Sequence, residues 1–154
     1  MKNSLVPVLL SLLLILPAMA QEAEQDPLYI QINNTSESSL TWPAGQALQL
    51  VLQYGNRSQE TANAYLQCSL FSASGATFSP EMSNGHGAEF EIVDDGEEIL
   101  FEVRELIPGQ NFNAQVAIDL SQQEENDRSM RVQCRLRDEN DDTLSRQRLT
   151  VEFE

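Results

Sequence analysis

The chain has 154 residues, with 24 acidic side chains against nine basic ones and a net charge of −15 at pH 7. Nucleic acids and anionic lipids repel a protein this acidic, so the charge disfavours both as partners, and we predict no nucleic-acid partner. The length suits one domain with a hydrophobic core of its own.

The first 20 residues have the three parts of a cleavable signal peptide. Lys2 supplies the positive charge, residues 5–16 are apolar, and Ala18-Met19-Ala20 has the small side chains that signal peptidase requires. The apolar stretch is only about 12 residues long, too short to cross a bilayer comfortably, although an uncleaved anchor is the alternative. We therefore predict cleavage after Ala20 and export to the periplasm or the medium. No later segment is apolar enough to predict a membrane span.

The rest of the chain alternates apolar and polar residues. This period of two is typical of strands with one buried and one wet face. The alternating segments are residues 28–33, 48–54, 64–70, 89–92, 99–104, 112–120, 130–137 and 148–153. Residues such as Gly55-Asn56 and Pro108-Gly109 favour turns between these segments. We predict a flexible leader over residues 21–27. Residues 28–154 should form one all-β domain, an immunoglobulin-like antiparallel sandwich of seven or eight strands.

The two cysteines, Cys68 and Cys134, both occupy apolar positions of their strands. An even pair in an exported protein indicates a disulfide. The bond could join neighbouring strands or cross the core, and two separate buried thiols are the alternative.

Two stretches resemble a known family. Residues 48–70 read as a strand, Gly55-Asn56, and a second strand that opens with Thr61-Ala62-Asn63; residues 106–110 read LIPGQ before a long strand. They resemble the immunoglobulin-like conserved-repeat domain of bacterial surface and exported proteins, a domain of unknown function, and the related adhesion-type sandwich modules. The resemblance covers about half of the chain that follows the signal peptide. It implies the sandwich fold and carries over no catalytic residue or cofactor.

Five of the eight arginines lie in the last two strands. These are Arg131, Arg135, Arg137, Arg146 and Arg148. Arg131, Arg135 and Arg137 share the wet face of one strand, so the five form a candidate interaction surface for a partner that bears carboxylate, sulfate or phosphate groups. The alternative is pairing within the chain, with Glu102, Glu105 and Glu152.

Other side chains suggest further chemistries. The acidic runs Asp94–Glu98 and Asp138–Asp142 could hold a weakly bound calcium ion, although the second lacks the glycine and the bidentate glutamate of an EF-hand loop. The single histidine, His86, is flanked by glycines in a predicted exposed loop, so a small hydrolase with a Ser-His-Asp triad is only a formal alternative.

Outward-facing aromatic residues raise the alternative of a carbohydrate-binding module. Tyr29, Tyr65 and Phe71 fall on the wet faces of their strands, while Trp42 is expected to close one end of the core. Our main prediction is an exported, non-enzymatic domain without a cofactor. It would act through an unidentified protein partner, or in the structure of the cell envelope. The alternative is a carbohydrate- or calcium-dependent binding module.

Overall fold

The computed structural model describes residues 26–33, 37–72, 74–124 and 126–154. The predicted signal peptide (1–20) and residues 21–25 of the predicted leader lie outside these ranges. Within them, no helix is long and apolar enough to cross a membrane.

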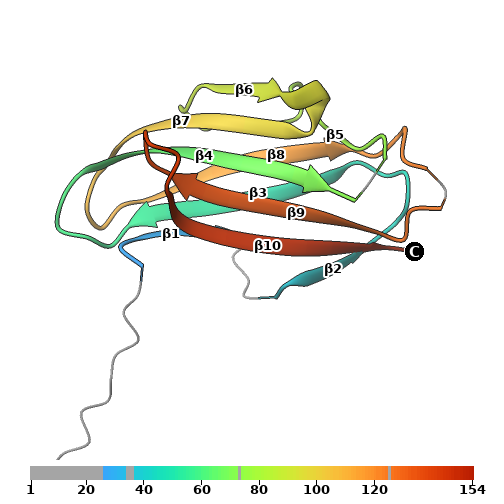
Figure 1. Ribbon diagram of the computed structural model, residues 1–154, viewed down its shortest axis with the longest axis horizontal. Helices are drawn as coiled ribbons and strands as arrows, with labels where there is room; N and C mark the ends of the chain where they lie inside the picture. Colours follow the sequence, from blue (N-terminus) through green and yellow to red (C-terminus); the bar gives the residue numbers. More distant parts are fainter. Residues whose placement is uncertain (1–25, 34–36, 73, 125) are drawn as a thin grey trace, which may run out of the picture.

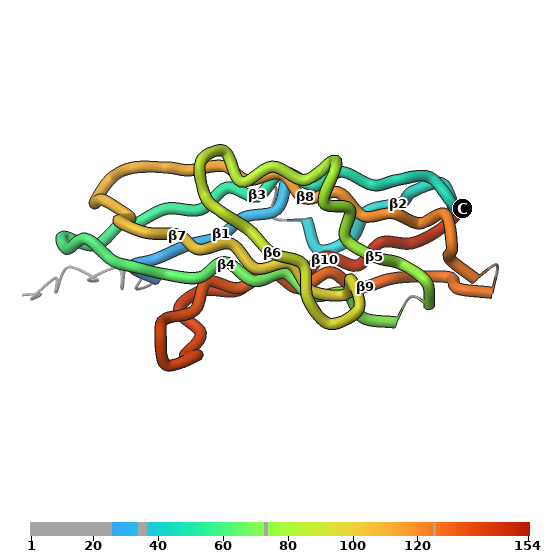
Figure 2. Tube along the Cα trace, turned by 90° about the horizontal axis from the view of Figure 1, so that it is seen from above, coloured from blue at the N-terminus to red at the C-terminus, as the bar shows by residue number. Residues whose placement is uncertain are grey.

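The described residues form strands and one short 3-10 helix, η1. Their bounds are β1 Leu28–Ile32, β2 Ser39–Trp42, β3 Leu48–Asn56, β4 Ala62–Phe71, β5 Thr77–Phe78, β6 Phe90–Val93, η1 Asp94–Gly96, β7 Glu98–Leu106, β8 Asn111–Asp119, β9 Ser129–Arg137 and β10 Thr143–Phe153. The strands make a four-stranded sheet, β1-β3-β8-β5, and a six-stranded sheet, β2-β10-β9-β4-β7-β6. Figure 1 shows the six-stranded sheet from β6 at the top to β2 at the bottom, and Figure 2 shows the two layers from the side.

The predicted β-sandwich is confirmed. Strands β1, β3 and β8 lie in one sheet and β4, β9 and β10 in the other, as strands A, B, E and C, F, G do in immunoglobulin domains. Strands β2 and β5 are additional to the eight predicted. The pair β2-β10 is parallel, whereas the sequence predicted an antiparallel fold. The pair can be parallel because β2 and β10 are far apart in the sequence and are not joined by a hairpin, which would make them antiparallel.

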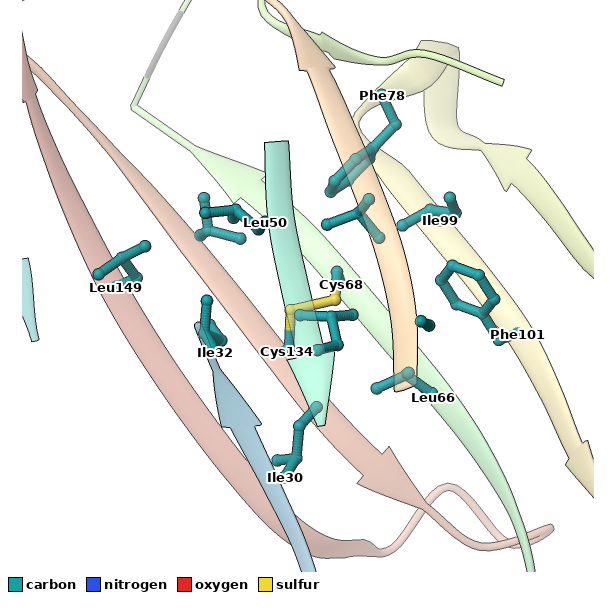
Figure 3. Packing of buried hydrophobic residues seen from close by; sticks show 14 of the residues in the cluster. Ile30, Ile32, Leu50, Leu66, Cys68, Phe78, Ile99, Phe101, Cys134 and Leu149 are labelled. Carbon is teal, nitrogen blue, oxygen red and sulfur yellow. A yellow bond between two sulfur atoms is a disulfide. The ribbon is translucent and has the colours of Figure 1, made fainter. Parts of the chain in front are cut away.

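The core fills the space between the two sheets, as the alternation predicted. Leu50 of β3, Leu66 of β4 and Val116 of β8 are fully buried. Figure 3 shows part of this cluster, which draws apolar side chains from both sheets around Cys68 and Cys134.

The predicted disulfide is confirmed, and it joins neighbouring strands of one sheet. Cys68 on β4 and Cys134 on β9 are direct register partners with Cα atoms 4.1 Å apart. Such a short separation is typical of an antiparallel pair that exchanges no backbone hydrogen bonds. In antibody domains the conserved disulfide instead connects the two sheets. Here the bond reinforces the β4-β9 pairing.

The predicted turn at Gly55-Asn56 is wrong, because both residues belong to strand β3. Asn56 is buried, and its amide group donates to the carbonyl oxygens of Glu60 and Leu106 at 2.7 and 2.8 Å. Its side-chain oxygen accepts from the backbone N–H of Ser58 at 2.8 Å. Asn56 therefore organises the loop after β3, which makes the reversal further along the chain.

Candidate interaction surface

The five predicted arginines lie on one face of the molecule. Strand β9 alternates buried and outward residues, and Arg131, Arg135 and Arg137 all take the outward positions. In the ladder between β9 and β10, Arg146 lies opposite Arg135. Directly opposed residues of neighbouring strands project to the same side, so the arginines share the outer face of the six-stranded sheet. We call Arg131, Arg135, Arg137, Arg146 and Arg148 the arginine face.

Two members of the arginine face are paired within the domain. Arg135 donates to the side-chain oxygen of Gln67 at 2.8 and 3.0 Å and to a carboxylate oxygen of Asp141 at 3.0 Å. Arg137 lies 3.3 Å from the same oxygen of Asp141, and its guanidinium carbon is 5.1 Å from the centre of the Tyr65 ring. Internal pairing was one of the two predicted readings of these arginines.

The acidic partner differs from the predicted ones. It is Asp141, in the hairpin between β9 and β10, instead of Glu102, Glu105 or Glu152. The carboxylate of Glu102 instead binds Arg104 of its own strand at 2.6 Å, an interaction that raises the pKa of Arg104.

The pairing of Arg135 extends across the sheet. Gln67 and Ser69 project outward from β4, yet each is only 8% exposed. Both donate to the carboxylate of Glu98 on β7, at 3.0 and 2.8 Å. A continuous polar row thus runs from Glu98 through Gln67 to Arg135. Sequence reasoning missed this row because alternation assigns an outward position without showing which neighbours cover it.

The remaining arginines are exposed. Arg131, Arg146 and Arg148 form no ion pair with any residue in the described part of the chain. Arg148 donates to the side-chain oxygen of Gln133 at 2.9 Å, which fixes its direction without neutralising its charge. Phe71, 44% exposed, is the register partner of Arg131. This part of the face combines guanidinium groups that have no ion-pair partner with an exposed ring.

The acidic run Asp138–Asp142 forms the hairpin between β9 and β10, which projects from the body of the sandwich in Figure 2. One carboxylate oxygen of Asp138 accepts the backbone N–H groups of Asn140 and Asp142 at 2.8 and 2.9 Å. The other run contributes to η1, where Asp94 and Asp95 have positive φ angles. In the described ranges, no three acidic, histidine or cysteine side chains are grouped so that they could hold a metal ion. Calcium binding stays a prediction.

His86 is exposed and lines a hollow of about 910 Å³. Residues of β3, β7 and β8 line the hollow, and two of them, Tyr54 and Phe112, stack with ring centres 5.8 Å apart. Burial raises the pKa of Tyr54. Glu89 also lines the hollow, but no serine, threonine or cysteine of the described chain does. The lining therefore lacks the nucleophile of a hydrolytic triad.

The outward tyrosines are already engaged. The guanidinium carbon of Arg57 lies 4.0 Å from the centre of the Tyr29 ring, and the Tyr29 hydroxyl donates to Asn111. Arg137 lies over Tyr65. A carbohydrate-binding site needs aromatic rings with an open face. Of Tyr29, Tyr65 and Phe71, the ring of Phe71 is the most exposed. Trp42 packs against the core, as expected.

No protein-family model matches this chain, and no curated protein matches its sequence. Among solved structures, the collagen-binding domain of a Staphylococcus aureus adhesin is similar, with a TM-score of 0.54 and 8% identity over 82% of this chain and 97% of that one. The DNA-binding domain of C. elegans Cep-1 has a TM-score of 0.53 and 12% identity over 82% and 89%. The Bacillus cereus major pilin BcpA scores 0.47, with 12% identity over 82% and 39%. At these identities, the first two likenesses show the sandwich fold alone.

Proposed function

We propose that this chain is an exported, non-enzymatic immunoglobulin-like domain that binds a partner protein through its arginine face. The signal-peptide pattern and the Cys68–Cys134 bond both support export, because disulfides persist in oxidising compartments. The partner is a protein of the cell envelope or its surroundings.

The observation that carries the proposal is the unneutralised charge of Arg131, Arg146 and Arg148. In a chain of net charge −15, three exposed guanidinium groups on two adjacent strands make a local field opposite in sign to that of the whole. Guanidinium groups bind carboxylates in a bidentate geometry, and arginine and aromatic residues are both enriched in protein interfaces. The face therefore suits a protein surface that presents Asp or Glu side chains.

The proposal is tested by affinity capture with the processed domain from an envelope extract. Arg146→Glu is compared with Arg57→Glu, since both residues are exposed and both changes alter the charge equally, while Arg57 lies away from the arginine face. We expect Arg146→Glu to lose the captured protein and Arg57→Glu to retain it. Equal capture by both variants would show that the partner binds elsewhere.

A further inference from the structure

In one row across the outer face of the six-stranded sheet, the charges at the two ends are opposite in sign. The strand registers align Glu91 of β6, Leu100 of β7, Gln67 of β4, Arg135 of β9 and Arg146 of β10 in a single row. Strand β4 is central in this row, with two strands on each side. At a strand spacing of about 4.8 Å, the acidic and the basic end of the row each lie about 10 Å from Gln67.

The acidic half contains a shallow hollow of about 420 Å³. Glu89, Glu91 and Glu102 line it together with Tyr65, Phe90, Leu100 and Arg137. Glu102 forms an ion pair with Arg104, whereas neither Glu89 nor Glu91 forms an ion pair within the described residues. Exposed carboxylates on one side of β4 thus match the exposed guanidinium groups of Arg146 and Arg148 on the other.

We propose that the partner of the arginine face is a second copy of this chain, packed face to face through the six-stranded sheet. This inference rests on the proposed function and names its partner. The two-fold axis lies between the two sheets, parallel to β4. Rotation about this axis exchanges the two sides of β4, so that Arg146 of one copy lies over Glu91 of the other. Two such contacts form, as the isologous interface of a two-fold dimer requires.

The centre of the face is uncharged, as the core of a protein interface should be. Its central strand, β4, presents Tyr65, Gln67 and Ser69, whereas the charged residues, among them Glu98 and Arg135, lie on the neighbouring strands. The six strands contain 47 residues, which at about 4.8 Å between strands and about 3.3 Å per residue cover roughly 740 Å². A standard interface buries about 800 Å² per partner, so the face is close to the size that a dimer needs.

The hairpin between β9 and β10 adds to this complementarity. It projects at the end of the face where Arg137 and Thr143 are opposed. The same rotation brings its carboxylates, among them Glu139, toward Arg104 of the second copy, whose side chain binds Glu102 and is still 73% exposed. Acidic and basic groups therefore meet in this row as well.

The test is the molar mass in solution of the processed protein, by sedimentation and light scattering up to millimolar concentration. We expect the wild type to dimerise. Arg146→Glu/Arg148→Glu and Glu89→Arg/Glu91→Arg should each weaken the dimer at least about tenfold. The Glu89→Arg/Glu91→Arg variant is the more informative of the two. It lowers the net negative charge, and therefore the general repulsion between copies, yet it should still lose the dimer. Circular dichroism and melting curves verify that each variant is folded.

The decisive measurement is the equimolar mixture of the two double variants. In each variant the substituted positions and the unchanged positions across β4 carry like charges, so each repels itself but attracts the other, and the mixture should regain dimers. A monomeric wild type, variants that dimerise like the wild type, or a mixture without heterodimers would overturn the inference. If the wild type is monomeric but still captures a protein, and the capture depends on Arg146, then the partner is not a second copy of this chain. The proposed function stands in that case.

Discussion

Reduction of the Cys68–Cys134 bond is expected to lower the free energy of unfolding by about 4 kcal/mol. The bond links residues 66 apart in the sequence. Closing a loop of that length lowers the conformational entropy of the unfolded chain and so raises its free energy by roughly 4 kcal/mol at 25 °C. Domains of this size are stable by about 5–15 kcal/mol. The reduced domain should therefore lose a large fraction of its stability.

The assay is urea unfolding with and without reductant, followed by the fluorescence of Trp42, the only tryptophan. With a denaturant slope of about 1–3 kcal/mol/M, the loss moves the midpoint down by roughly 1–4 M. Without urea the reduced protein should keep its strand content, since residues 65–71 of β4 still pair with β9. The double variant Cys68→Ala/Cys134→Ala is the control, because reductant should leave its midpoint unchanged.

Identical midpoints for the oxidised and the reduced wild type would refute this reasoning. A mass spectrum taken without reductant separates the two causes. Two free thiols would mean that the bond does not form, whereas an intact bond would mean that it does not restrict the unfolded chain.

Three further outcomes are expected. Gln67→Leu removes the amide that connects Arg135 to Glu98, and should lower the free energy of unfolding in urea by about 1–3 kcal/mol. An unchanged free energy of unfolding would show that the polar row does not stabilise the fold. Gly55→Ala places a methyl carbon 2.8 Å from the Tyr29 hydroxyl and 2.7 Å from a backbone oxygen. This crowding should lower the free energy of unfolding by about 1–3 kcal/mol. A melting temperature equal to that of the wild type would contradict this expectation. Because burial raises the pKa of Tyr54, the fold favours the neutral phenol. That contribution is complete below the unfolded pKa of about 10 and is lost as pH rises through the higher folded value. Melting temperatures from about pH 8 to pH 11 should therefore fall more steeply for the wild type than for Tyr54→Phe.

Several features of the larger sheet could be predicted from local alternation. The period of two identified β4 and β9 as strands, placed Cys68 and Cys134 on their buried side, and put Arg131, Arg135 and Arg137 on the opposite side. Each of these properties depends only on the direction in which successive side chains project from an extended backbone. The sequence by itself was enough for them.

The identity of each neighbour was decided by the tertiary structure. Asp141 pairs with Arg135 because the hairpin folds back over β9, and Gln67 is covered because β4 lies at the centre of the sheet. Gly55 is required because Tyr29 comes from a strand more than twenty residues earlier. Alternation fixes the face of a side chain, whereas strand order and register are set by packing between distant segments. The opposed charges on the two sides of β4 follow from that order, so only the folded sheet shows them.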